Sequence, residues 1–229
     1  METMTSTTQN SEALAKNARV IAISSGKGGV GKTSIAANLS LAFAEQGHRV
    51  LAMDADLGLA NLDICLGVSP DLSLLDLIDG GTTIEEVLCE GPEGVALLPG
   101  CSGRYDLANL DDTQRYSLFK AIDTLEEKYD VLLLDTGAGI GSNAISFAAA
   151  ASQVIIVANP EPTSLADAYA FIKVASQEFG IKRFQVIANM VMNAKEAEDV
   201  YRRLADLCGR FLTAGVDFLG FIPRDSAVP

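Results

Sequence analysis

The stretch Ser25-Gly26-Lys27-Gly28-Gly29-Val30-Gly31-Lys32-Thr33 decides the fold of this chain. It fits the pattern G-x-x-x-x-G-K-[ST], whose fixed places are taken by Gly26, Gly31, Lys32 and Thr33. The run Val20–Ser24 before it is typical of a buried strand. Apolar residues recur at helical spacing after it, at Ile35, Leu39, Ala42 and Phe43. Strand, glycine loop and helix in this order predict a loop that binds a polyphosphate.

The residue types of the loop suit that chemistry. Glycines allow the backbone to approach a phosphate closely, so that successive N–H groups point at its oxygens near a helix N-terminus. Lys32 is expected to neutralise the terminal phosphates. The hydroxyl of Thr33 suits Mg²⁺, which keeps most of its waters and takes few protein ligands.

Lys27 has no part in this scheme. A second lysine in the loop serves either the site that Lys32 already occupies or a phosphate elsewhere. For the motif as a whole, the alternative is a chance match in a glycine-rich turn, and the flanking strand and helix argue against it.

Composition narrows the class of protein. The chain has 229 residues, 48% of them apolar, and no Trp, which favours a single α/β domain. Its net charge of -13 argues against binding to DNA, because affinity for a phosphate polymer needs clustered Lys and Arg. The four cysteines form no C-x-x-C pair, and neither a signal peptide nor a run of membrane-spanning length is visible. These features favour a cytoplasmic protein with reduced thiols.

Apolar runs of strand length alternate with helical patterns along the chain. The expected strands are Val50–Met53, Val95–Leu98, Val131–Leu134, Val154–Ala158, Phe184–Ala188 and Phe218–Ile222, and the clearest helices are Thr113–Lys128 and Lys195–Phe211. Continuous hydrophobicity predicts strands that are buried on both faces. The alternation predicts a doubly wound, mostly parallel sheet flanked by helices. Residues 1–18 are expected to form a disordered tail and residues 19–229 the folded domain.

Polar residues follow several of these strands, and ligands of such sheets bind at the carboxyl ends of the strands. Asp135 is expected to hold a magnesium-bound water. Asp54 and Asp56 lie two residues apart, so that one can face the nucleotide while the other supports the loop. We favour Asp56 for polarising the attacking water. Asp54 is the alternative, either in that role or as a second metal contact through water.

With its second lysine, the loop resembles that of the deviant Walker A ATPases of the MinD/ParA class, P-loop NTPases of the SIMIBI group. Three further segments resemble the FlhG/FleN branch, which regulates flagellar number and placement: Asp54–Asp63, Glu161–Lys173 and Arg183–Met190. The resemblance runs from about Val20 to Asp225, nearly the whole chain.

The resemblance implies a slow, Mg²⁺-dependent ATPase that forms a face-to-face homodimer with ATP and returns to monomers after hydrolysis to ADP. Lys27 would reach the partner subunit's phosphates, while the other loop residues would surround the phosphates of their own subunit: Gly26, Gly28, Gly29, Val30, Gly31, Lys32, Thr33 and Ser34. Lys32 and Lys27 would act on the reacting phosphates together with Asp56. Asn189 would contact the adenine edge, with help from Pro223 and Asp225, and the alternative is that its amide only caps the end of a strand.

The resemblance also suggests partners, namely an FlhF-type GTPase, a flagellar transcription regulator or a basal-body protein. Family members usually continue into an amphipathic helix that binds membrane, whereas this sequence stops at Pro229. Attachment to the inner membrane is therefore expected only of a longer parent protein. Ser11–Lys16 is at best a degraded form of the N-terminal element with which some relatives activate FlhF. The alternative functions are partition of DNA, placement of the division site, and transport of a metallocluster, which would need a cysteine pair.

Overall fold

The computed structural model describes residues 18–101 and 110–226, and the expected tail of residues 1–17 lies outside them. Ala18, the first described residue, is buried. The strands are β1 (Arg19–Ser25), β2 (Val50–Ala55), β3 (Cys89–Glu90), β4 (Ala96–Leu98), β5 (Val131–Ala138), β6 (Gln153–Ala158), β7 (Arg183–Val191) and β8 (Gly215–Pro223). The helices are α1 (Lys32–Glu45), α2 (Leu62–Leu66), α3 (Leu74–Ile78), α4 (Ile84–Val87), α5 (Asp112–Asp123), α6 (Ser142–Ala150), α7 (Pro162–Glu178) and α8 (Ala194–Phe211), with a 3₁₀ turn at Pro92–Gly94.

The strands form one eight-stranded sheet in the order β3-β4-β2-β5-β1-β6-β7-β8. Every pairing is parallel except that of β3 with β4. The predicted doubly wound, mostly parallel sheet is therefore confirmed, and all six predicted strands are present. The strand β1 lies near its middle, between β5 and β6, so the loop that follows β1 leaves from the centre of the sheet.

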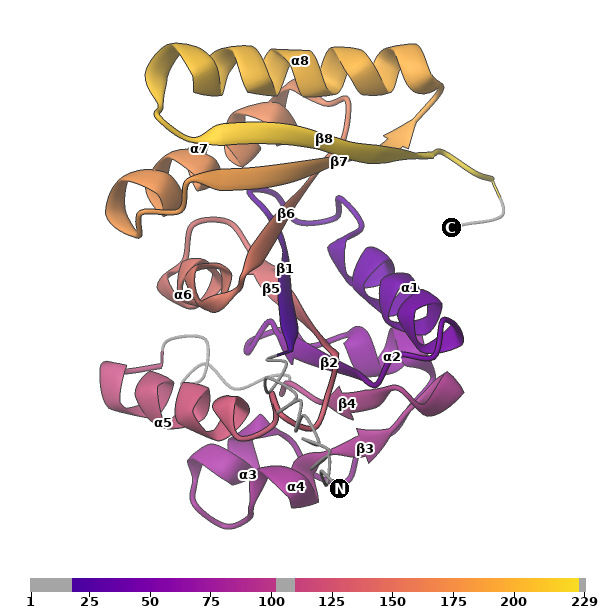
Figure 1. Cartoon of the computed structure of the whole chain (residues 1–229), viewed down its shortest axis with the longest axis vertical. Helices are drawn as coiled ribbons and strands as arrows, with labels where there is room; N and C mark the ends of the chain where they lie inside the picture. The colour runs from indigo at the N-terminus through magenta and orange to yellow at the C-terminus, as the bar shows by residue number, and fades with distance from the viewer. Residues whose placement is uncertain (1–17, 102–109, 227–229) are drawn as a thin grey trace, which may run out of the picture.

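Successive residues of β1 enter different cores, because side chains alternate across a strand. Ile21 and Ile23 pack with α1 and α2 on one face, whereas Val20 and Ala22 join the core beneath α5, α6, α7 and α8 on the other. Figure 1 shows α1 and α2 on one side of the central strands and α5, α6 and α7 on the opposite side.

Two predictions about these elements need correction. The helix expected over Thr113–Lys128 ends at Asp123. Beyond it the chain continues in tighter i→i−3 turns, in which Leu125 N–H bonds Ile122 C=O and Lys128 N–H bonds Leu125 C=O. Leu125 stays fully buried, which explains why the apolar pattern outlasts the helix.

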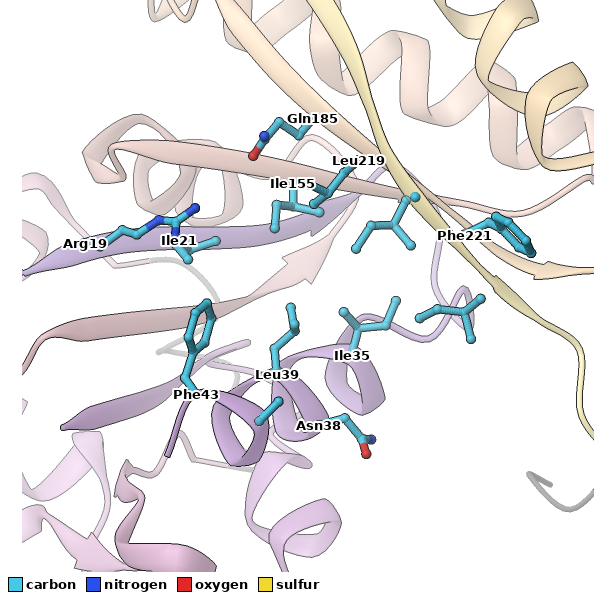
Figure 2. Close-up of a pocket in the computed structure, with 14 residues that line it drawn as sticks. Arg19, Ile21, Ile35, Asn38, Leu39, Phe43, Ile155, Gln185, Leu219 and Phe221 are labelled. Carbon is cyan, nitrogen blue, oxygen red and sulfur yellow. The ribbon is translucent and has the colours of Figure 1, made fainter. Parts of the chain in front are cut away.

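The prediction that the strands are buried on both faces is wrong for β8. Four of its large apolar residues are between 41% and 47% exposed: Phe218, Leu219, Phe221 and Ile222. The helix α8 packs against one face of β8 through Tyr201 and Phe218. The other face borders an apolar groove of about 530 Å³, whose opposite wall is formed by Ile35, Leu39 and Phe43 of α1 (Figure 2).

Candidate nucleotide site

The glycine-rich loop connects the end of β1 to the start of α1. Gly31 is the N-cap of α1 and has φ 94°, and Gly29 has φ 75°. Both angles lie in the left-handed region, which L side chains adopt only at a cost. The loop therefore has the backbone form in which N–H groups gather at a helix N-terminus.

Gly26 is required for a different reason, which is its close approach to α7. A Cβ at Gly26 would lie 2.0 Å from the carbonyl carbon and oxygen of Asp167 and 2.6 Å from the nitrogen of Ala168. All three atoms belong to the backbone of α7. The entrance of the loop is thus packed directly against the first turns of a helix that begins 136 residues later.

Lys32 lies at the start of α1 among three carboxylates. It is only 8% exposed. Burial lowers the pKa of its ammonium group, and Asp135, Asp56 and Asp54 oppose that shift by favouring the charged form. The amine of Lys32 therefore lies inside the site, where it can act on a phosphate without competition from bulk water.

Asp135 is 2% exposed and lies on β5, beside the loop. Burial raises its pKa to about 7, although a hydrogen bond from the Thr33 hydroxyl favours the ionised form. Its Oδ1 atom is buried and has no hydrogen-bond partner among the described residues. An unsatisfied buried oxygen of this kind indicates a missing partner.

Mg²⁺ with its waters fits this place. The described residues contain no group of three or more His, Cys, Asp or Glu side chains that could hold a metal. A magnesium ion bound beside Thr33 and Asp135 would therefore take its remaining ligands from water and phosphate oxygens, as Mg²⁺ commonly does. The bound Mg²⁺ would neutralise negative charge on the phosphates.

Asp54 and Asp56 have different surroundings. Asp54 is 1% exposed, and its two oxygens accept hydrogen bonds from the backbone N–H groups of Asp56 at 3.0 Å, Asn61 at 2.8 Å and Leu62 at 2.9 Å. Burial raises its pKa to about 6 against the effect of these bonds. Asp54 thus shapes the loop that leads into α2.

Asp56 is half-buried and accepts a 3.3 Å bond from the N–H of Leu59. Its carboxylate also lies beside the segment after β5, where a Cβ on Gly137 would be 3.5 Å from its Cγ and Oδ1 atoms. Asp56 therefore has more freedom to contact a ligand than Asp54. This arrangement supports our preference for Asp56, which stays a prediction.

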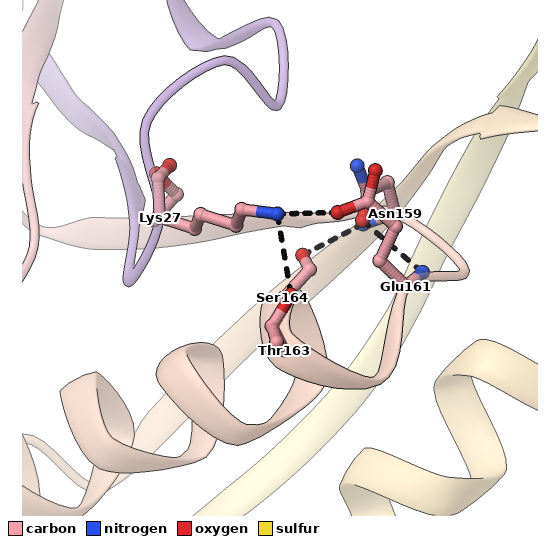
Figure 3. A network of polar contacts seen from close by, with 6 residues as sticks. Lys27, Asn159, Glu161, Thr163 and Ser164 are labelled. Atoms are coloured by element: carbon pink, nitrogen blue, oxygen red, sulfur yellow. Dashed lines mark hydrogen bonds and ion pairs between the residues drawn. The ribbon is translucent and has the colours of Figure 1, made fainter.

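Lys27 does not turn toward the buried site in the single chain. Its ammonium group pairs with the carboxylate of Glu161 and lies 3.2 Å from the hydroxyl of Thr163, at the start of α7 (Figure 3). The loop that carries Glu161 is itself fixed, because the side chain of Asn159 accepts a bond from the Glu161 N–H at 3.2 Å. Sequence reasoning gave Glu161 and Thr163 no role. Their position directly after an apolar strand was the signal that could have found them.

The structure brings the three expected adenine contacts to one end of the sheet. Asn189 is near the end of β7, and Val191 pairs with Pro223 of β8. Asp225 follows two residues later and is exposed. The amide of Asn189, however, donates a 2.7 Å hydrogen bond to the carbonyl of Val30 in the loop, which sequence reasoning did not anticipate.

Comparison of the sequence with known proteins identifies relatives of this chain. A family model described as an AAA domain matches residues 18–184. The chain is 43% identical over 210 residues to the antiactivator FleN of Pseudomonas aeruginosa. This alignment covers 92% of this chain and 75% of FleN. The chain is 37% identical over 211 residues to the flagellum site-determining protein YlxH of Helicobacter pylori, covering 92% and 71%.

Solved structures give the same result. The septum site-determining protein MinD of Pyrococcus horikoshii, solved in complex with Mg-ADP, is similar with a TM-score of 0.71 and 31% identity over 92% of this chain and 83% of that chain. Among the described residues, no helix is both long and apolar enough to cross a bilayer. The sequence matches, the sheet and the phosphate-binding loop together show that this chain belongs to the MinD/ParA family of ATPases, with FleN and YlxH among its relatives.

Proposed function

We propose that this chain is an ATP-dependent dimerisation switch that regulates the number and placement of flagella. Its identities with FleN and YlxH, at 43% and 37%, support the flagellar assignment. The observation that carries the switch is the position of Lys27. This lysine belongs to the phosphate-binding loop but pairs at the surface with Glu161, outside its own buried site.

The buried site already has what one nucleotide needs. Lys32 supplies the cation, and Thr33 and Asp135 are the groups beside which magnesium would bind. Lys27 is surplus to that set and lies outside the buried site, paired with Glu161. Lys27 is 35% exposed and Glu161 is 56% exposed, so a second subunit can approach both.

The pairing of Lys27 with Glu161 is also easy to break. Exposed ion pairs of this type contribute only about 0 to 1 kcal/mol. The charges on the phosphates of a second subunit's ATP would compete well with one carboxylate, since charge-assisted bonds to phosphate are strong. We therefore infer that Lys27 leaves Glu161 for the partner's nucleotide when two ATP-bound chains meet.

Asp56 is the group that we assign to hydrolysis. It is half-buried beside Gly137 and retains capacity to accept a further hydrogen bond. It can therefore orient a water without disturbing the loop that Asp54 supports. Hydrolysis would return the dimer to monomers, and a flagellar transcription regulator, an FlhF-type GTPase or a basal-body protein would respond to the change.

The test measures association and hydrolysis on the same samples. Light scattering after size exclusion, with Mg²⁺ and ATP, should show a dimer for the wild type and a monomer for Lys27→Ala. Lys128→Ala is the matched control, because Lys128 is another exposed lysine paired with a glutamate. Asp56→Ala should keep the dimer and lose ATP turnover. If Lys27→Ala dimerises with ATP as the wild type does, the proposed role of Lys27 is wrong.

Placement of the division site is the second candidate, and the likeness to the MinD structure favours it. Deletion of the gene separates the two functions. Altered flagellar number with normal division supports the flagellar assignment. Minicells with normal flagellation would replace it with division-site placement.

A further inference from the structure

A hydrogen bond joins the end of β7 to the phosphate-binding loop. The side-chain amide of Asn189 donates to the carbonyl oxygen of Val30 at 2.7 Å, across 159 residues of sequence. Asn189 is 6% exposed. The bond is therefore shielded from water, and its loss would leave a buried carbonyl without a partner.

The backbone of β7 is shaped to make this contact. Its pairing with β8 shifts register between Asn189 and Val191, and Met190 between them has φ 58°. A left-handed non-glycine residue is strained, and such residues gather at functional sites. A bulge of this kind changes the direction of the neighbouring side chains.

As a result, two consecutive residues of β7 reach the same part of the loop. A Cβ on Gly31 would lie 2.3 Å from the Nδ2 atom of Asn189 and 3.8 Å from the Cε atom of Met190. In a regular strand successive side chains point to opposite faces of the sheet. The contact of both with Gly31 thus depends on the bulge.

The carbonyl that Asn189 holds belongs to the peptide between Val30 and Gly31. In a trans peptide the C=O and the N–H point in opposite directions. Anchoring the Val30 carbonyl toward β7 therefore directs the N–H of Gly31 away from β7. Gly31 is the N-cap of α1, where N–H groups meet a bound anion.

We infer that Asn189 is a positioning residue for the phosphate-binding loop, which it orients through the Val30 carbonyl. This inference rests on the proposed binding of nucleotide at the loop and differs from the predicted role of Asn189 as an adenine contact. The two roles make different demands on the ligand. A residue that orients the loop affects every ligand with the same phosphates, whereas a residue that reads adenine affects only the base.

The test compares ligands with and without a base. Affinities for ADP, GDP and inorganic pyrophosphate, each with Mg²⁺, are measured by calorimetry for the wild type, Asn189→Asp and Asn189→Ala. Asn189→Asp keeps the size of the side chain but removes the donor that faces Val30. We expect both variants to bind all three ligands on the order of tenfold more weakly, including the one without a base.

Asn38→Asp is the matched control. The amide of Asn38 also donates to a backbone carbonyl at 2.7 Å, that of Ser34 in its own helix. This variant should bind the three ligands as the wild type does. Thermal unfolding of every variant, without ligand, shows whether the substitution acts through folding.

Two results would overturn the inference. They are a loss of ADP and GDP affinity with pyrophosphate binding unchanged, and a lower Tm with all three affinities unchanged. The experiment measures binding alone. A wild-type chain that binds ADP but stays monomeric with ATP would refute the dimerisation switch and leave this test intact.

Discussion

The contact between Gly26 and α7 allows a stability prediction in which three neighbouring glycines are compared. Alanine at Gly26 would place its Cβ 2.0 Å from backbone atoms of Asp167, whereas ordinary contact begins at 3.4 Å. The loop and α7 must then separate by about 1.4 Å, because neither partner is a flexible side chain. Overpacking of this kind typically costs about 1 to 3 kcal/mol of unfolding free energy.

The two other glycines isolate different effects. A Cβ at Gly28 meets nothing within 4 Å and its φ is not in the left-handed region. Gly28→Ala should therefore be neutral or stabilise by up to about 1 kcal/mol, because alanine restricts the unfolded chain. Gly29 has equal space but φ 75°. Gly29→Ala carries a left-handed penalty of about 1 to 2 kcal/mol, partly offset by the same unfolded-state gain.

The measurement is urea unfolding of the nucleotide-free protein, followed by far-ultraviolet circular dichroism because the chain has no Trp. The unfolding free energy should rank Gly28→Ala highest, then Gly29→Ala, then Gly26→Ala. A loss of about 2 kcal/mol for Gly26→Ala corresponds to a Tm lower by about 4 to 8 °C at this chain length. If Gly26→Ala unfolds within 0.5 kcal/mol of Gly28→Ala, which is about the scatter of neutral substitutions, the packing of the loop on α7 is not as described.

Three further predictions follow from burial and hydrogen bonding. Asp54→Asn should lower the unfolding free energy in urea by about 1 to 3 kcal/mol, because an amide NH₂ group would replace one carboxylate oxygen that accepts backbone N–H bonds; unchanged stability would contradict that role. Leu219→Ser should reduce the fluorescence of an apolar dye bound in the groove beside β8, because it removes an apolar side chain from the groove wall. Tyr116→Ser, at an exposed site on α5, should leave the dye fluorescence unchanged. Equal fluorescence for the two variants would show that the dye does not bind in the groove. Iodoacetamide at pH 8 should modify the exposed Cys65 and spare Cys208, whose buried thiol has its pKa raised to about 11; modification of Cys208 in the folded chain would contradict its burial.

Local patterns predicted the sheet and the loop well because both depend on short stretches of sequence. The glycine spacing, the strand before it and the helix after it are all contained in Arg19–Glu45. The short helices α2, α3 and α4 were not predicted, since four or five residues are too few to display a helical period. Their N-terminal signals were nevertheless present, as in the capping boxes that begin at Ser73 and Thr83.

The predictions were less accurate where the outcome depends on which distant segment packs against a strand or loop. The apolar run Phe218–Ile222 correctly predicted a strand, but hydrophobicity cannot tell a face that is covered from one that borders a groove. The same limit applies to the site. The sequence singled out Lys27 as surplus, but its pairing with Glu161 spans 134 residues and depends on how α7 meets the loop.

The contacts on the loop also differ in how readily they break, which has a consequence for the switch. The buried bond from Asn189 to Val30 and the packing of Gly26 on α7 hold the two ends of the loop in a water-poor setting, where losing a partner is costly. The pair of Lys27 with Glu161 is exposed and contributes little. In the proposed dimer, a second subunit would therefore draw Lys27 away without deforming the phosphate-binding loop. Glu161→Gln should accordingly favour ATP-dependent association, with ADP affinity unchanged, in the same light-scattering and calorimetric measurements. Weaker association of Glu161→Gln would mean instead that Glu161 supports the dimer.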